Sequence, residues 1–355
     1  MNTSQNPLLC DIILRIFCRQ SIITHRALNK LNNNHHDCQS VSQLRVLVLG
    51  GTGFLGSRIV TRLASRGHEV TILTRRTEAA EFFGSRGIET IVGDLMEPEA
   101  FMDRLSPQDC VVSVAMPLEF GRISKSKFAQ IKERTTKFVS TALTIGKNLD
   151  SSTILTLGTA YSTKPGQVAD ESWPLVRKGL TKAGEEADVL IAKAMKEGQP
   201  LIILLPGQIY GPGGQFLKMY EMMKNGRSGV FGKGDNHIPR VHVDDCAQAF
   251  VLAVEKQPVG ESFIVADDTP CTTREFTERM AECMGLSKPR TAPMFIARFI
   301  LGSLLLSILQ MNCVVTNEKA KKELGWELEY PSYHEGLKAT IENLREGTVF
   351  DQSRF

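Results

Sequence analysis

The 355-residue sequence lacks a hydrophobic run long enough to cross a membrane, because a spanning helix needs about twenty mostly apolar residues. Residues 8–17 are apolar but contain Asp11 and Arg15. Residues 294–311 are the other apolar stretch, and their uninterrupted part is residues 299–309. We therefore expect no membrane span. For residues 294–311 we expect a buried or lid-like helix, with a groove for an apolar ligand or a peripheral membrane contact as the alternatives.

Patterns typical of disulfides, zinc sites and serine hydrolases are also missing. The eight cysteines form no Cys-x-x-Cys pair, which favours a reducing compartment. His242, Asp244 and Asp245 lack the spacing of metal ligands, and Asp244 is better explained as the cap of a following helix, so we expect no metal. No serine stands in a Gly-x-Ser-x-Gly elbow. The net charge of +3 indicates no basic stripe for nucleic acid.

The first 43 residues differ from the rest of the chain in composition. They are rich in Asn, Gln, Ser and His, and their only acids are Asp11 and Asp37. We expect residues 1–43 to be a disordered extension outside the fold of a cytoplasmic protein. Acid-poor leaders that contain Arg and Ser are also typical of organelle targeting, so targeting through residues 1–43 is the alternative.

A nucleotide-binding pattern stands at residues 46–56. Four residues of β type, 46–49, run directly into the loop Gly50-Gly51-Thr52-Gly53-Phe54-Leu55-Gly56. Its glycines fit both Gly-x-x-Gly-x-x-Gly and Gly-x-Gly-x-x-Gly, and either spacing provides a tight turn, room for a pyrophosphate and close packing of a helix on a strand. Apolar residues then recur at helical spacing, at Phe54, Leu55, Ile59, Val60 and Leu63. We expect the backbone N–H groups of this helix to face the phosphates of a dinucleotide.

Strand patterns and helix patterns alternate over the next part of the chain. The expected strands cover residues 46–49, 69–74, 88–93, 110–115, 153–157 and 201–205. One long helix is expected to carry Phe128, Ile131, Phe138, Ala142 and Ile145 on one face, and another covers residues 178–196. Most of the strands are continuous apolar runs, which is typical of a parallel sheet covered on both faces. The sequence therefore predicts an α/β fold with a doubly wound parallel Rossmann sheet and right-handed crossovers.

The alternation becomes less regular from about residue 211 onward. We expect residues 44–210 to form a Rossmann domain that binds NAD(P). Residues 211–345 are expected to form a smaller, mostly helical C-terminal substrate lobe, and residues 346–355 a tail. No pattern in the expected lobe distinguishes one class of small-molecule substrate from another.

The end of the second expected strand indicates which dinucleotide binds. An acidic residue there selects NAD, whereas arginine accommodates the additional phosphate of NADP. The chain has Thr74-Arg75-Arg76 at this point, and a guanidinium holds a phosphate through two parallel hydrogen bonds, so we predict NADP rather than NAD. In the next turn Asp94 is expected to bind the adenine amino group and Leu95 to cover the ring. The remaining predicted cofactor contacts are Gly50, Thr52, Gly53, Phe54, Leu55, Gly56 and Ala115.

Four ordered motifs give the chain a resemblance to a known family. They are the loop of residues 50–56, the turn Gly93-Asp94-Leu95, the segment Pro206-Gly207-Gln208-Ile209-Tyr210-Gly211-Pro212 and the stretch Val241-His242-Val243-Asp244-Asp245. With these motifs the chain resembles the NAD-dependent epimerase/dehydratase family, the extended and atypical branch of the short-chain dehydrogenases, from about residue 44 to the final helix. The resemblance implies a Rossmann sheet and a helical lobe that closes over sugar, steroid, flavonoid or other small substrates.

The resemblance also implies catalytic residues. Family members carry a Tyr-x-x-x-Lys pair after the fifth strand. The tyrosine transfers a proton while a hydride moves between the nicotinamide and the substrate, and the lysine lowers the tyrosine pKa and binds the nicotinamide ribose. The matching segment is Lys178-Gly179-Leu180-Thr181-Lys182, so Lys182 is present and Lys178 replaces the tyrosine. Thr159 matches the hydroxyl that polarises the substrate carbonyl.

Three explanations of the missing tyrosine stay open. Tyr161, two residues after Thr159, serves as the acid/base, or the chemistry proceeds by positioning alone, or the protein binds NADP without turnover. The leading prediction is an NADP-dependent oxidoreductase or epimerase/dehydratase-type enzyme, monomeric or homodimeric, that acts on a small carbonyl or hydroxyl substrate such as a sugar nucleotide. Its catalytic residues are predicted to be Thr159, Tyr161 and Lys182. The alternative is a non-catalytic NADP-binding regulatory or assembly protein.

Overall fold

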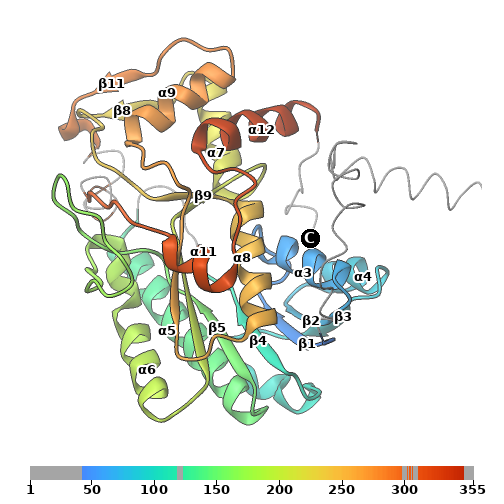
Figure 1. Ribbon diagram of the computed structural model, residues 1–355. Helices are drawn as coiled ribbons and strands as arrows, with labels where there is room; N and C mark the ends of the chain where they lie inside the picture. The colour runs from blue at the N-terminus through green and yellow to red at the C-terminus, as the bar shows by residue number, and fades with distance from the viewer. Residues whose placement is uncertain are drawn as a thin grey trace, which may run out of the picture. The chain divides into compact units, whose positions relative to one another are not determined.

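Seven parallel strands form the central sheet of the computed structural model, in the order β10-β6-β5-β4-β1-β2-β3 (Figure 1). The structure describes residues 42–117, 123–297, 302, 304, 306 and 311–347. The strands are β1 (Arg45–Leu49), β2 (Glu69–Thr74), β3 (Glu89–Val92), β4 (Cys110–Ser113), β5 (Ser152–Thr156), β6 (Leu201–Pro206) and β10 (Ser262–Val265). The strand order reverses between β1 and β4, so a binding crevice is expected at the carboxyl ends of these two strands. The predicted doubly wound parallel sheet is confirmed.

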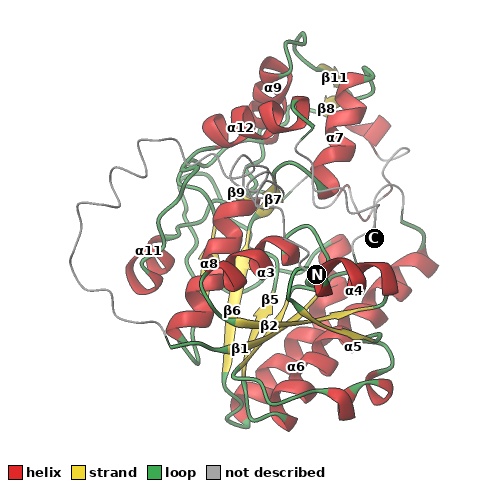
Figure 2. Cartoon of the chain, turned by 90° about the vertical axis from the view of Figure 1, so that its right-hand side faces the viewer, coloured by secondary structure: helices red, strands yellow, loops and turns green. Residues whose placement is uncertain are grey.

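Helices cover both faces of this sheet (Figure 2). One face packs against α3 (Gly56–Ser65), α8 (Val243–Lys256) and α11 (Glu318–Leu324), and α4 (Thr77–Gly84) follows β2. The other face packs against α5 (Lys125–Asn148) and α6 (Glu185–Lys196). Alternate residues of β1 serve the two faces, because Val46 and Val48 lie in the first apolar cluster and Leu47 and Leu49 in the second. Burial on both faces explains why the strands are continuous apolar runs.

The expected helix over residues 178–196 is divided in the structure. A short 3-10 helix, η3 (Gly179–Gly184), precedes α6. Gly179 has a φ of +54°, in the left-handed region that a right-handed helix does not use, and this conformation separates Lys178 from the helix. The prediction of one continuous helix was therefore wrong at its start.

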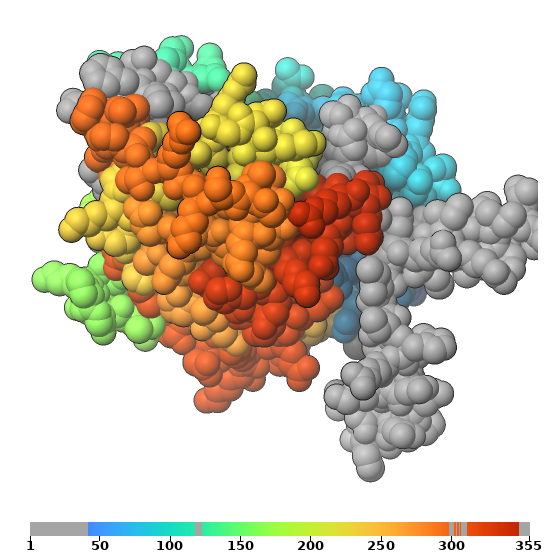
Figure 3. Space-filling view, turned by 90° about the horizontal axis from the view of Figure 1, so that it is seen from above, coloured from blue at the N-terminus to red at the C-terminus, as the bar shows by residue number. Residues whose placement is uncertain are grey.

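The C-terminal part of the chain builds a third apolar cluster above the carboxyl end of the sheet. It contains Phe216 on α7 (Gly214–Lys224), Phe276 on α9 (Thr273–Cys283) and Tyr333 on α12 (Tyr333–Arg345). Figure 3 shows α7 (yellow), α9 (orange) and α12 (red) side by side on one face. Two small parallel pairs complete this region: β7 (Gln208–Tyr210) pairs with β9 (Arg240–His242), and β8 (Gly229–Phe231) pairs with β11 (Arg290–Ala292).

The chain returns to the sheet after it has entered this second region. Both α8 and β10 follow residue 210, and β10 pairs with β6 as the seventh strand of the sheet. The sequence did not predict this strand. The division into residues 44–210 and 211–345 stays a prediction, and α8 and β10 are the elements of the second range that pack with the first.

Several sequence expectations fall on residues beyond the described ones. The extension 1–43, except for its last two residues, the tail 346–355, except for its first two residues, and most of residues 298–310 lie there, so these expectations stay predictions. Within the described ranges, no helix combines the length and the hydropathy that a membrane span requires. Within the same ranges, no group of three or more His, Cys, Asp or Glu side chains is arranged to hold a metal ion.

Candidate functional site

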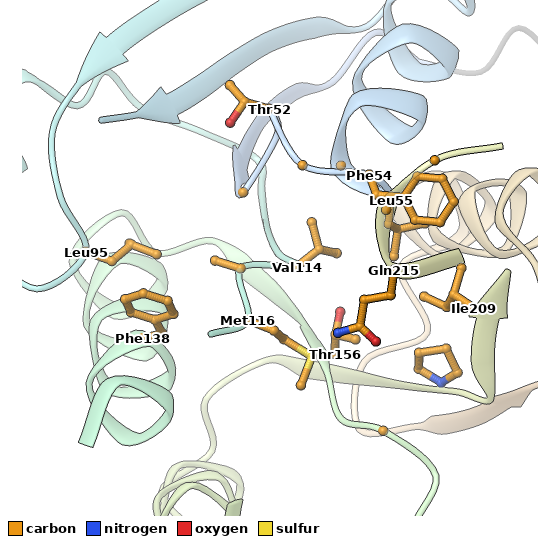
Figure 4. Close-up of a pocket in the computed structure, with 18 of the residues that line it drawn as sticks. Thr52, Phe54, Leu55, Leu95, Val114, Met116, Phe138, Thr156, Ile209 and Gln215 are labelled. Atoms are coloured by element: carbon orange, nitrogen blue, oxygen red, sulfur yellow. The ribbon is translucent and has the colours of Figure 1, made fainter. Parts of the chain in front are cut away.

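A cavity of about 750 Å³ lies at the carboxyl ends of the central strands, a volume suited to a small-molecule ligand (Figure 4). Its walls come from the glycine loop, from the residues that follow β2, β3, β4 and β5, from α5, and from the segment that leads through β7 into α7. The predicted cofactor residues that line it are Gly50, Thr52, Gly53, Phe54, Leu55, Gly56, Arg75, Asp94, Leu95 and Ala115. Arg76, Thr159, Tyr161 and Lys182 are not among the lining residues.

The glycine loop has the shape that the sequence pattern requires. Gly50 has a φ of +88°, and a Cβ at this position would lie 2.8 Å from the backbone nitrogen of Ala115. A Cβ at Gly56 would overlap the carbonyl oxygen of Gly50. The N–H of Gly53 donates to this same carbonyl oxygen at 2.9 Å. The first and last glycines are therefore needed for the tight turn and for the close approach of α3 to the loop.

The start of α3 provides backbone donors for an anion. Leu55 caps the helix without a side-chain hydrogen bond, and the first turn contains no acidic residue. The N–H groups of Phe54 and Leu55 have no acceptor within the described ranges. These donors and the positive end of the helix dipole face a cavity that is lined by the same residues, so the loop fits a pyrophosphate.

Arg58 connects the glycine loop to the second half of the chain. Its Nη1 donates to the carbonyl oxygen of Phe54 at 3.1 Å, and its Nε lies 3.2 Å from Oδ1 of Asp244 at the start of α8. Burial lowers the pKa of the Arg58 guanidinium, and the Asp244 carboxylate counteracts this effect. The ring of Phe54 in turn packs on Gly214, where a Cβ would lie 2.8 Å from Cδ1 of the ring. Phe54 therefore lies between the phosphate loop and the start of α7.

The residues after β2 and β3 form one end of the cavity. The side chain of Arg75 is 62% exposed, and its Nη1 lies 4.0 Å from Oδ2 of Asp94. Asp94 also accepts a hydrogen bond from the N–H of Met96 at 3.0 Å, which holds the turn after β3. Arg76 is the N-cap residue of α4, and its own N–H donates to Oγ1 of Thr74. A guanidinium that lines the cavity directly after β2 fits an additional phosphate, because an exposed pair at 4.0 Å is weak and easily exchanged.

Two residues of α5, Arg134 and Phe138, line the cavity although the sequence had not indicated them as site residues. Phe138 faces Leu95 in Figure 4, and the guanidinium carbon of Arg134 lies 5.6 Å from the centroid of the Phe138 ring. Helical periodicity had assigned Phe138 to the core face, and it does pack there. The sequence carried no signal that the same ring also borders a ligand cavity.

The structure does not bring the predicted acid/base Tyr161 to the cavity. Its side chain is 1% exposed and packs in the apolar cluster between the sheet and the helices α5 and α6. Burial raises the pKa of Tyr161 to about 12, with a further contribution from the charge of Glu171. In this position the phenol is enclosed by protein.

Thr159 and Lys182 also lie outside the cavity lining. The N–H and the hydroxyl of Thr159 both donate to the carbonyl oxygen of Pro206, at 3.1 and 3.4 Å. Lys182 is exposed on η3. The nearby hydroxyl that does line the cavity belongs to Thr156, the last residue of β5. Its place at the carboxyl end of a parallel strand was the sequence signal that could have identified it.

Thr156 belongs to an inner end of the cavity that it forms with Met116, Ile209 and Gln215 (Figure 4). The Thr156 hydroxyl donates to the carbonyl oxygen of Ser113 at 3.0 Å. Gln215 is half-buried in the first turn of α7 and points toward Thr156 and Met116. Within the described ranges, the cavity is lined by no tyrosine, histidine or cysteine.

A second side-chain amide, that of Gln208, borders the cavity, but it is already hydrogen-bonded to a buried arginine. Its Oε1 accepts a hydrogen bond from Nη1 of Arg240, a residue that is only 3% exposed. Arg240 is held over the ring of Phe276, with its guanidinium carbon 3.6 Å from the ring centroid. Burial lowers the pKa of Arg240. The amide of Gln208 is therefore an acceptor for a buried cation.

Comparison with known proteins agrees with this geometry. The solved structure of human epimerase family protein SDR39U1 (isoform 2) with NADPH superimposes with a TM-score of 0.70, at 21% identity, over 84% of this chain and all of that chain, which shows the shared fold. The 3-diazoavenalumate denitrifying reductase of a Streptomyces species is 27% identical over 83% of this chain and 99% of the reductase. The 2-alkyl-3-oxoalkanoate reductase of Stenotrophomonas maltophilia is 28% identical over 74% of this chain and 82% of that enzyme.

The family assignment rests on a match between this chain and the model of one protein family. The model of the NAD dependent epimerase/dehydratase family matches residues 46–266, which is more than half of the chain and includes the glycine loop, β7, β9 and β10. The chain therefore belongs to the NAD-dependent epimerase/dehydratase family, as its four motifs predicted.

Proposed function

We propose that this protein is an NADP-dependent reductase that converts the ketone group of a small, largely apolar substrate to an alcohol. The observation that carries the proposal is the cavity itself. Its rim holds the unpartnered N–H groups of Phe54 and Leu55 and the guanidinium of Arg75, whereas its inner end has an uncharged lining. Reductases among the relatives favour reduction over binding without turnover.

The cofactor residues are proposed from their position around the cavity. Residues 50–56 hold the pyrophosphate, Arg75 with its neighbour Arg76 holds the 2′-phosphate, and Asp94 and Leu95 hold the adenine. Ala115 borders the dinucleotide from the end of β4. When bound, NADPH supplies the hydride. The contact between Lys182 and the nicotinamide ribose is proposed from family resemblance only, because this lysine is exposed outside the cavity lining.

The proposed chemistry proceeds by positioning rather than by a tyrosine acid. Tyr161 is enclosed in the core, and the Thr156 hydroxyl already donates its hydrogen bond to the carbonyl oxygen of Ser113. The protein's contribution is then to hold the ketone against an uncharged lining and to stabilise the charge that develops on its oxygen. Water at the open rim delivers the proton to the product.

The test measures binding and turnover separately. Calorimetry gives the dissociation constant of NADPH, and the consumption of NADPH is then followed with acetophenone and with a 2-alkyl-3-oxoalkanoate. We expect micromolar binding of NADPH and faster alcohol formation from acetophenone than from the 2-alkyl-3-oxoalkanoate, which carries a carboxylate near its ketone. Tight binding of NADPH without reduction of any ketone would support a binding protein instead.

A further inference from the structure

We infer that the side-chain amide of Gln215 donates a hydrogen bond to the carbonyl oxygen of the substrate, and that this substrate presents a ketone flanked by apolar, uncharged groups. The inference rests on the proposed reductase function and adds the residue that recognises the reacting group. Its starting point is Figure 4, in which Gln215 reaches from α7 toward Thr156 and Met116 at the inner end of the cavity.

The backbone before Gln215 fixes the direction of its side chain. Gly213 and Gly214 have φ angles of +146° and +54°, a turn that only glycine forms easily, and α7 begins directly at Gly214. Gly214 is in close contact with the ring of Phe54, and the guanidinium carbon of Arg58 lies 4.9 Å from the centroid of the same ring. Because the turn is supported by packing, Gln215 enters the cavity from a rigid element, which is what a polarising group requires.

The amide of Gln215 is available as a donor. It makes no hydrogen bond to any group within the described ranges, although the residue is half-buried. The hydroxyl of Thr156 donates its hydrogen bond to the carbonyl oxygen of Ser113, so in this arrangement it offers a ligand only its lone pairs. A half-buried amide that has no partner among the described residues gains a hydrogen bond when a ligand carbonyl arrives, and this gain favours ligands that carry such an oxygen.

The other polar residues of the lining are less suited to this role. Gln208 is committed through its oxygen to the buried Arg240. Lys218, one turn beyond Gln215, is exposed and already has an interaction partner. Arg75 lies at the end of β2 with Asp94. Gln215 is thus the donor that points into the inner end.

The surroundings of Gln215 define the substrate class. The inner end is formed by Thr156, Met116, Ile209 and Gln215, none of which carries a charge. The cations that line the cavity, Arg75, Arg134 and Lys218, are not among these residues, so a phosphate or carboxylate held next to the reacting carbon would be desolvated against uncharged groups. A ketone between alkyl or aryl groups loses little on entering and gains the bond to the amide.

The experiment compares two matched variants that remove an amide donor from the same cavity. In Gln215→Glu the donor at the inner end is lost, and in Gln208→Glu the acceptor for Arg240 is kept while an amide N–H₂ is lost. Acetophenone that is isotopically labelled at its carbonyl is bound to the holoenzyme with oxidised NADP⁺, and the carbonyl stretching frequency is recorded by infrared difference spectroscopy. This readout needs no turnover.

In the unchanged protein we expect a carbonyl frequency lowered by the hydrogen bond. The shift is kept in Gln208→Glu and is lost in Gln215→Glu at high pH. We also expect kcat/KM for acetophenone to fall about 100-fold in Gln215→Glu, as for the loss of one donor to a developing oxyanion. The loss is regained as the pH falls, because a protonated carboxyl group again donates a hydrogen bond.

The outcomes separate this inference from the proposed function. If the unchanged protein reduces acetophenone and the frequency shift persists in Gln215→Glu with bound NADP⁺, the role of Gln215 is wrong and the reductase proposal stands. A shift that disappears in Gln208→Glu instead would assign the donor to Gln208 and overturn the inference. If the unchanged protein binds NADPH and reduces no ketone, the reductase proposal fails, and the role of Gln215 fails with it.

Discussion

The Nε atom of Arg58 lies 3.2 Å from Oδ1 of Asp244, so the first turn of α3 is joined to the first turn of α8. Arg62 adds a second cation at 3.5 Å from the same oxygen. The Arg58 and Asp244 side chains are only 16% and 28% exposed, which makes this pair different from the surface ion pairs of the molecule. Removal of one partner leaves a largely buried charge without compensation.

We therefore predict that Asp244→Asn lowers the free energy of unfolding by about 2 kcal/mol, measured by urea denaturation. The control is Arg45→Ala, which removes an exposed ion pair with Asp109 and is expected to cost less than about 1 kcal/mol. Equal losses of unfolding free energy in the two variants would show that the Arg58–Asp244 pair stabilises the fold no more than an exposed ion pair does.

The prediction of NADP specificity is tested at Arg75. The variant Arg75→Ala is expected to raise the dissociation constant of NADPH by about 10- to 100-fold and that of NADH by less than about 2-fold, because only NADPH carries the phosphate that the guanidinium binds. Calorimetry with both cofactors measures the ratio. The control is Arg86→Ala, which removes a guanidinium stacked on Phe82 at the other end of α4. A parallel loss for NADH and NADPH would refute the assignment of Arg75.

Two glycines allow a matched pair of alanine variants, one in the glycine loop and one at the end of α4. In Gly56→Ala the new Cβ overlaps the carbonyl oxygen of Gly50, so the loop must move and the dissociation constant of NADPH is expected to rise by about 100-fold. In Gly84→Ala the new Cβ meets no atom within 4 Å, and we expect unchanged binding with slightly higher stability. Thermal unfolding and calorimetry on both variants check the pair. Normal NADPH binding by Gly56→Ala would contradict the proposed pyrophosphate site.

The buried His242 predicts how stability depends on pH. Burial lowers the pKa of His242 to about 4, below the ordinary histidine value of 6.5. Because the folded-state pKa is depressed, its contribution to stability is fully present above about pH 6.5 and is lost as the pH falls toward 4, by roughly 3 kcal/mol in total.

The variant His242→Asn tests this dependence. Asn keeps a side-chain acceptor for the N–H of Asp244, which His242 now provides through Nδ1 at 3.3 Å, but it does not titrate. We expect a shallower fall of unfolding free energy between pH 6.5 and pH 4 than in the unchanged protein. The change His334→Gln, at an exposed histidine, is expected to leave the slope as it was. An unchanged slope in His242→Asn would show that another group is responsible.

Local signals were sufficient for six strands of the sheet and for most of the residues proposed to hold the dinucleotide, which line one cavity. Apolar runs marked six of the seven strands, and the loop of residues 50–56 and Arg75 were found because short motifs fix their backbone and their place in the strand order. The seventh strand, β10, was missed because it follows a long excursion through the C-terminal region and pairs with β6, a contact that no local pattern encodes.

The residues proposed to contact the substrate were harder to predict from the sequence, for a physical reason. Tyr161 and Thr159 stand in the right stretch of sequence, but their side chains turn to the core and to Pro206, and the direction of a loop side chain depends on tertiary packing. Gln215 follows two glycines and carries no motif, so only the three-dimensional turn reveals it.

The contact of Phe54 with Gly214 limits how mutations can alter the ligands that this protein accepts. The ring of Phe54 lines the same cavity as the glycine loop and the start of α7. Under the proposed function, a shift of α7 that enlarges the space for a substrate also displaces this ring, and we expect it to weaken coenzyme affinity. We expect new substrate preferences to evolve through replacements elsewhere in the lining, such as Met116, where bulk can be altered without displacing the ring of Phe54.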